Sequence, residues 1–137
     1  MAEEAATSDL VELTRQFGEA LNRGEFSAAK LRLYLHPDVE WLPLRAATEG
    51  AFHGIAGMER FWADTEEVFE KFELRYELLN LGGRVLAWGE IHLRARGSGI
   101  ETDIPTGGIF DFRDGKIVRW EDFGSKEKAL DAVELEG

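Results

Sequence analysis

The feature that most constrains the fold is an alternation of apolar and charged residues in the second half of the chain. Apolar side chains occupy every second position from Phe72 to Leu78, and Gly82-Gly83 then marks a turn. A β-strand presents successive residues to opposite faces, so this period of two predicts a half-buried strand. Three further strands are expected at 85–96, 101–112 and 116–123. The last two flank Asp114-Gly115, a dipeptide typical of a tight hairpin turn, so the segments predict an antiparallel meander.

The first half of the chain carries the helical period instead. Ser8 or Asp9 is expected to cap a helix that ends at 22–24 and buries Leu10, Leu13, Phe17, Ala20 and Leu21. Two more helices are predicted at 26–35, where His36-Pro37 stops the helix, and at 55–71, with an aromatic face. A short strand is expected at 39–44 and a serine-capped helix at 125–135. Helices followed by a meander are typical of α+β proteins, in which N-terminal helices cover one face of a curved antiparallel sheet and leave a cavity.

Composition limits the classes of function. The 137 residues, 44% of them hydrophobic, are expected to form a single domain over 1–137. The net charge of −11 disfavours nucleic acid and anionic membrane surfaces as partners. Cysteine is absent, which excludes disulfides and thiolate catalysis. No metal site is expected, because no two of the three histidines have the i, i+4 spacing of helical ligands: His36, His53 and His92.

The N-terminal residues predict no targeting signal. Residues 1–5 are acidic, and no apolar core segment follows them. No apolar run in the sequence approaches the roughly 20 residues that span a bilayer. We therefore expect a cytoplasmic protein with no membrane segment.

Four short segments stand in a recognisable order: FGEALNRGE at 17–25, HPDVEW at 36–41, FHGIAGMERF at 52–61 and FDFRDGKI at 110–117. Together they resemble the SnoaL-like branch of the nuclear transport factor-like superfamily. The resemblance covers nearly the whole chain and implies a cone-shaped α+β barrel. It also implies a pocket for a small apolar molecule, no cofactor, and a homodimer formed through the outer face of the sheet.

The resemblance carries over to function only residue by residue. Related ketosteroid isomerases have a base Asp where Trp41 stands, an oxyanion Tyr at Phe17 and a second Asp near Gly108, so that chemistry is not expected here. Related limonene-epoxide hydrolases use an Asp-Arg-Asp set, of which Asp122 is retained while the other positions fall on Gly89 and Ile91. SnoaL-like cyclases need one acid/base carboxylate, and Asp122 can supply it.

The same placement predicts which side chains line the pocket. Two strands are expected to contribute Val85, Ala87, Gly89, Ile91 and Leu93, and Ile104, Thr106, Gly108, Phe110 and Phe112. Other members of the chamber would be Val118, Trp120, Phe17, Val39, Trp41, Phe61 and Trp62. Asp122 is predicted to be catalytic, because desolvation in such a chamber raises the pKa of a carboxyl group toward the range of a general base. Substrate binding is assigned to Phe17, Trp41, Phe61, Trp62, Ile91, Gly108, Phe110, Trp120 and His53.

Plainer interpretations of the same residues stay open. Asp122 can instead cap the turn at 124–126 by accepting amide hydrogen bonds, and the tryptophans can be ordinary core residues. His53 can be an exposed loop residue without a role. The outward-facing residues predict either a homodimer contact or cover by the C-terminal helix: Leu86, Trp88 and His92.

Two functions fit these residues. The first is a cofactor-independent enzyme of cyclase, isomerase or hydrolase type, which performs acid/base chemistry on an apolar cyclic or polyketide-like molecule. The second is a non-catalytic protein of the same fold that binds an apolar ligand or forms a dimeric scaffold. The missing acid/base partners favour the second function, and an aromatic pocket serves both.

Overall fold

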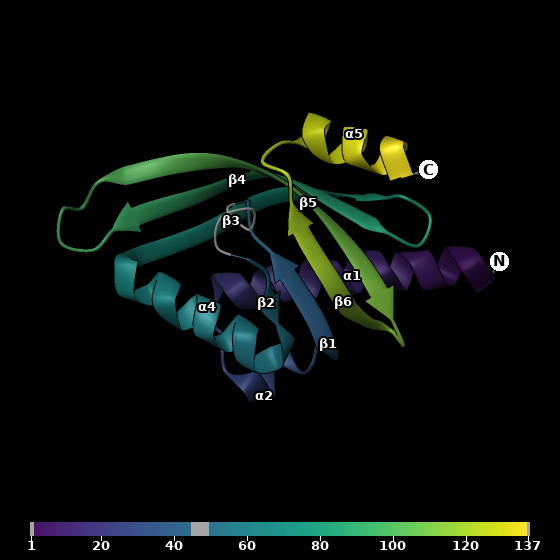
Figure 1. Ribbon diagram of the computed structural model, residues 1–137, viewed down its shortest axis with the longest axis horizontal. Coiled ribbons are helices and arrows are strands. Elements are labelled where there is room, and N and C mark those ends of the chain that lie inside the picture. The colour runs from purple at the N-terminus through teal and green to yellow at the C-terminus, as the bar shows by residue number, and fades with distance from the viewer. Residues whose placement is uncertain (1, 45–49, 137) are drawn as a thin grey trace.

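A curved sheet of six strands organises the computed structural model, which describes residues 2–44 and 50–136 (Figure 1). The strands are β1 (Leu35–Leu42), β2 (Phe52–His53), β3 (Phe69–Asn80), β4 (Val85–Ala95), β5 (Glu101–Arg113) and β6 (Lys116–Asp122). They lie in the order β2-β1-β6-β5-β4-β3. All neighbours are antiparallel except β1 and β6, which pair in parallel. The expected α+β class is confirmed, and the parallel pair is an addition to the predicted meander.

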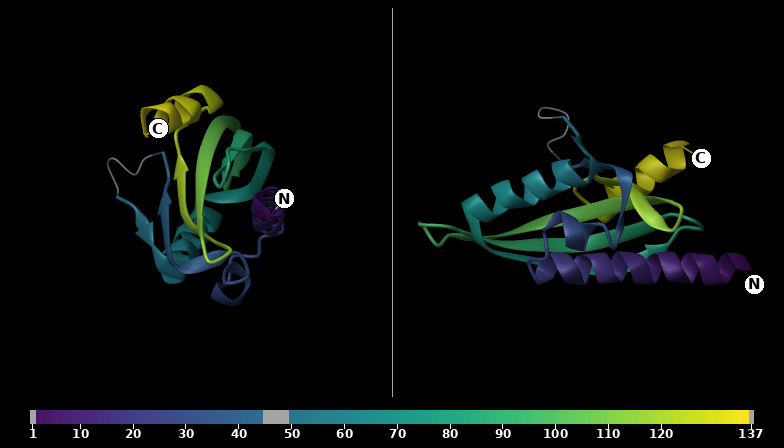
Figure 2. Two further views of the ribbon diagram at one scale, coloured as in Figure 1. Left: turned by 90° about the vertical axis from the view of Figure 1, so that its right-hand side faces the viewer. Right: turned by 90° about the horizontal axis from the view of Figure 1, so that it is seen from below.

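The described helices lie on both faces of this sheet. Helix α1 (Ala2–Asn22) runs along the sheet beside β3, while α4 (Gly54–Val68) covers the inner face next to the short α2 (Ala28–Leu31) (Figure 2). Phe17 of α1 and Trp62 of α4 share one buried cluster with Phe110 and Trp120 of the sheet. Helix α5 (Lys126–Glu136) packs against the opposite, outer face.

Helix α1 is fastened to β3 by side chains that bond to backbone groups. The Asn22 side chain donates to the Leu74 carbonyl at 3.0 Å and accepts from the Leu74 amide at 2.7 Å. The Tyr76 hydroxyl donates to the Arg15 carbonyl at 3.1 Å and lies where a Cβ on Gly18 would stand. Glycine at that position therefore permits the close approach of helix and strand.

Pairing with neighbouring strands shortens two of the predicted helices. The helix expected at 26–35 ends at Leu31, because the Ile117 amide of β6 donates to the Tyr34 carbonyl at 2.9 Å and draws the chain into β1. The helix expected at 55–71 ends at Val68, whose carbonyl accepts from the Arg96 amide at 2.9 Å. Helix α1 begins at Ala2, so the proposed cap at Ser8 or Asp9 was wrong.

On the outer face of the sheet, helix α5 covers part of the surface that was predicted to form a dimer contact. Leu86 is fully buried beneath Ala129 of α5, so it is not available for the contact predicted for it. Lys126 Nζ lies 4.2 Å from the centre of the Trp88 ring, and the predicted serine cap is present because the Lys128 amide donates to Ser125 Oγ at 3.1 Å.

His92 lies farther along the outer face and is held by two acidic side chains. Its Nδ1 is 2.6 Å from Asp103 Oδ1, and its Nε2 is 3.0 Å from Glu101 Oε1. These hydrogen bonds raise the pKa of His92 above its ordinary value, because they stabilise the imidazolium form. An ion pair and not an apolar contact thus occupies this end of the face.

Candidate functional site

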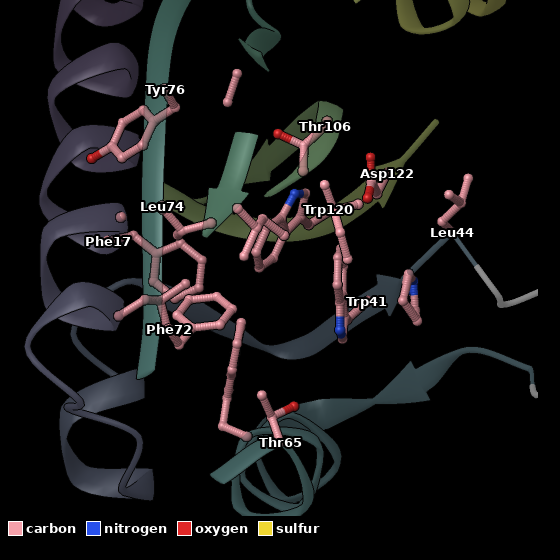
Figure 3. Close-up of a pocket in the computed structure, with 18 of the residues that line it drawn as sticks. Phe17, Trp41, Leu44, Thr65, Phe72, Leu74, Tyr76, Thr106, Trp120 and Asp122 are labelled. Atoms are coloured by element: carbon pink, nitrogen blue, oxygen red, sulfur yellow. The ribbon is translucent and has the colours of Figure 1, made fainter. Parts of the chain in front are cut away.

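A cavity of about 510 Å³ lies between the inner face of the sheet and helices α1 and α4 (Figure 3). Nine of the residues predicted for the site line it: Phe17, Trp41, Phe61, Trp62, Ile91, Gly108, Phe110, Trp120 and Asp122. Their roles in binding or catalysis remain predictions. His53 lies outside the described wall, on the β2 strand, where its exposed ring stands 3.6 Å from Glu40 Oε2. The placement of His53 in the site was therefore wrong.

The centre of the wall is a stack of aromatic rings. The parallel register sets Trp41 directly beside Trp120, and their ring centroids are 3.9 Å apart at an interplanar angle of 29°. Phe17 meets Trp120 edge to face at 5.5 Å. The stack depends on the pairing of β1 with β6, two segments about 80 residues apart in the chain.

A β-bulge displaces Val118, which was predicted to line the cavity. The register between β5 and β6 shifts between Asp111 and Phe112, and Ile117 becomes the residue opposite Phe112. Ile117 is therefore fully buried in the inner core. Val118, which alternation alone assigns to that face, does not border the cavity.

The site predicted from the sequence did not include the part of the cavity wall that β3 forms, nor two threonines on the helices. The inner face of β3 contributes Phe72, Leu74, Tyr76 and Leu78, which the alternation of that segment could have identified. Thr14 and Thr65 also line the cavity, but their hydroxyls donate to the carbonyls of Leu10 and Phe61 at 2.8 and 2.9 Å. These hydroxyls are therefore already used within their own helices.

Asp122 caps the turn after β6 and also borders the cavity. Its Oδ1 accepts the amide hydrogens of Gly124 at 2.9 Å and Gly107 at 3.2 Å, as a turn cap does. Among the described residues, no hydrogen bond is made to Oδ2, and the side chain borders the cavity. Burial raises the pKa of Asp122 above its ordinary value, although the two amide hydrogen bonds act in the opposite direction.

The polar groups of the cavity gather at the Asp122 end. Asp122 stands opposite Gly108 in the β5–β6 register, and Thr106 is the next residue of β5 on the same face. Figure 3 shows the indole nitrogen of Trp120 directed toward Thr106 and Asp122. A Cβ on Gly108 would lie 2.7 Å from Trp120 Nε1, so a residue with a side chain at this position would crowd the indole nitrogen. The remaining wall is almost entirely apolar.

Few charges face the cavity. Asp122 and Tyr76 are the only ionisable side chains among the described lining residues, and burial raises the pKa of Tyr76, which keeps its hydroxyl neutral. The part of the chain that the structure describes contains no cluster of three or more His, Asp or Glu side chains placed to hold a metal ion. No described helix has the length and apolar character needed to cross a membrane.

An apolar cavity enclosed by a curved sheet and its helices defines the cone-shaped α+β fold of NTF2-like proteins. Within that class, the family model of the SnoaL-like domain matches residues 14–120, and the chain belongs to this family. The expected family is thus confirmed. No curated protein matches the sequence.

Solved structures share the fold at low sequence identity. TerC, crystallised with polyporic acid, is 22% identical with a TM-score of 0.73, over 92% of this chain and 98% of TerC. A proposed polyketide cyclase from Xanthomonas campestris pv. campestris is 25% identical with a TM-score of 0.74, over 85% and 90% of the two chains. An NTF2-like protein of unknown function from Burkholderia pseudomallei is 20% identical with a TM-score of 0.74, over 93% and 96%.

Proposed function

We propose that this protein binds an apolar cyclic or polyketide-like molecule in the cavity and acts on it as a cofactor-independent acid/base enzyme. Asp122 is the residue that takes up and returns the proton. One observation carries the proposal: among the described lining residues, a single carboxyl group faces a largely apolar cavity, and its Oδ2 is free of described hydrogen bonds. Solved structures that share the fold include proposed polyketide cyclases, which supports this class of substrate.

The surroundings of Asp122 suit proton transfer. Burial destabilises the ionised carboxylate and so raises its pKa, which makes it a stronger base than an exposed aspartate. The amides of Gly107 and Gly124 hold Oδ1 in place, which leaves Oδ2 as the oxygen for a substrate proton. A ring system held against the stacked Trp41 and Trp120 would be positioned by contact and not by charge.

The proposal can be tested without the natural substrate, by the exchange of protons next to a ketone. In D₂O the protein is expected to accelerate deuterium incorporation at the methyl group of 2-acetylnaphthalene, followed by proton NMR. In this exchange the methyl proton moves to Asp122 and its electron pair delocalises onto the ketone oxygen, before a deuteron is returned to carbon. Asp122→Asn should lose at least about 100-fold of the acceleration, the usual contribution of a general base, and keep its affinity for the ketone.

The matched control is Asp114→Asn, on the exposed turn of the same hairpin. It changes the protein's charge equally but lies away from the cavity, so its exchange rate should match that of the unmodified protein. Acceleration retained by Asp122→Asn would reject Asp122 as the base.

The competing function is binding without catalysis, and two residues of the buried cluster favour it. The positions that carry a base and an oxyanion donor in ketosteroid isomerases are Trp41 and Phe17 here, and both belong to the buried cluster. The same experiment separates the two functions: tight binding of the ketone with no accelerated exchange would establish a binding protein.

We further propose that the protein forms a homodimer through the outer face of β3–β5, beyond the part covered by α5. His92 remains from the predicted contact, whereas Leu86 is buried under α5 and Trp88 packs against the same α5 cluster. The mass in solution, measured by light scattering at several concentrations, should be twice that of the 15.4 kDa chain. A mass of one chain at all concentrations would contradict the dimer.

A further inference from the structure

We propose that the indole N–H of Trp120 is a specific hydrogen-bond donor to a carbonyl oxygen of the ligand, and that the ligand is therefore a neutral ketone or related carbonyl compound. This inference rests on the proposed function, because it names the chemical group that the same cavity recognises. It gives Trp120 a role beyond that of an aromatic surface.

The Trp120 N–H is available to a ligand, in contrast to those of its neighbours. Trp41 Nε1 and Trp62 Nε1 are fully enclosed and have no hydrogen-bond partner among the described residues. Trp120 Nε1 is not enclosed in this way, and no described hydrogen bond uses it. An N–H that faces an apolar cavity has lost its hydrogen bonds to water, so a ligand acceptor there restores a favourable interaction.

The local architecture keeps this donor at the polar end of the cavity. Phe110 pairs with Trp120 in the β5–β6 register and stacks on it at 5.0 Å, which fixes the plane of the indole. Gly108, the next inward residue, has no side chain to cover the nitrogen, since a Cβ would lie 2.7 Å from it. The N–H therefore opens into a notch beside Asp122.

The combination of groups distinguishes between classes of ligand. A carboxylate or phosphate ligand would meet Asp122 with no described Lys or Arg lining the cavity to offset the repulsion. An amine would satisfy Asp122 but would place its positive charge against the N–H of Trp120 in the same notch. A neutral carbonyl compound uses the donor, and its neighbouring acidic C–H or O–H can face Asp122.

The test compares a ketone with a hydrocarbon of the same shape, 2-acetylnaphthalene and 2-isopropylnaphthalene, by isothermal titration calorimetry. The unmodified protein is expected to prefer the ketone by about fivefold, the value of one neutral hydrogen bond. Trp120→Phe keeps an aromatic ring but removes the N–H, so the ratio of ketone affinity to hydrocarbon affinity within this variant should fall to about one.

Trp41→Phe is the matched control, because it makes the same change in the stacked neighbour, whose N–H is enclosed. The ketone preference should survive there. Infrared spectra of the bound ¹³C-labelled ketone supply a second readout. The carbonyl stretch should lie at lower frequency in the unmodified protein and in Trp41→Phe, and return toward its apolar-solvent value in Trp120→Phe. If Trp120→Phe does not fold, Gly108→Ala is used, since its methyl group would occupy the notch.

The outcomes distinguish a failure of this inference from a failure of the proposed function on which it rests. Equal binding of the two probes, or a ketone preference that survives in Trp120→Phe or is lost equally in Trp41→Phe, would overturn the role of Trp120 and leave apolar ligand binding intact. Failure of both probes to bind the unmodified protein would instead contradict the proposed function.

Discussion

The burial of Leu86 beneath α5 gives a quantitative prediction about the outer face of the sheet. Leu86→Ala removes three carbon atoms from a fully buried side chain, worth about 2.4 kcal/mol at ~0.8 kcal/mol for each CH₂ group. The remaining void adds to this loss, so we expect the free energy of unfolding to fall by about 3–4 kcal/mol. For a chain of this length, that corresponds to a melting temperature about 10 °C lower.

Leu79→Ala is the matched control, because Leu79 is the direct cross-strand partner of Leu86 on the same face but is 40% exposed. It should cost about 1 kcal/mol or less, since much of the removed surface is already in contact with water. Equilibrium unfolding in urea, followed by far-ultraviolet circular dichroism, measures both losses.

Protein concentration separates burial by α5 from burial by a second copy. If α5 covers Leu86, the loss caused by Leu86→Ala is the same at low and high concentration, because the contact lies within one chain. Equal losses for the two leucine variants, or a loss for Leu86→Ala that appears only at high concentration, would refute the packing of α5 described here.

Two further predictions concern the ends of β5 and β6. Asp122→Asn keeps an acceptor for both amides but cannot ionise. Because the fold raises the pKa of Asp122, its stabilising contribution is present below the ordinary pKa of aspartate and is lost as pH rises through the raised value. The free energy of unfolding of the Asn variant should therefore rise relative to that of the unmodified protein as pH increases, as measured by urea unfolding across pH 3–8. A difference between the two proteins that does not change with pH would contradict the raised pKa. Gly107→Ala places a Cβ against the Ser125 backbone, so it should cost about 1–3 kcal/mol and speed hydrogen exchange in α5; unchanged exchange there would show that α5 is not seated on β5.

Local patterns in the sequence predicted most elements, because they are determined by residues close together in the chain. Alternation located β3 to β6 within three residues, and Asp114-Gly115 identified the hairpin turn, where Asp114 adopts a positive φ of 53°. The same alternation assigned Ile91 and Phe110 to the inner face, where both line the cavity.

The misplaced residues are those decided by contacts between distant segments. The helix predicted to reach residue 35 ends early because Tyr34 bonds to β6, and Val118 leaves the inner face because the β5–β6 register shifts. His53 was assigned to the site from its neighbours in sequence, but pairing of β2 with β1 places it beside Glu40. In each case the strand that decides the position lies outside the segment whose own pattern gave the prediction.

The sequence by itself determined the fold class, the family and the apolar character of the interior. Hydrophobic periodicity and turn residues act locally, so these signals do not depend on how the strands pair. Only the tertiary structure decided which polar groups meet in the cavity. Asp122, Thr106 and the Trp120 N–H come together because β6 lies between β5 and a parallel β1, and because Gly108 carries no side chain at their meeting point. That juxtaposition depends on strand register, and register is set by the packing of the whole sheet.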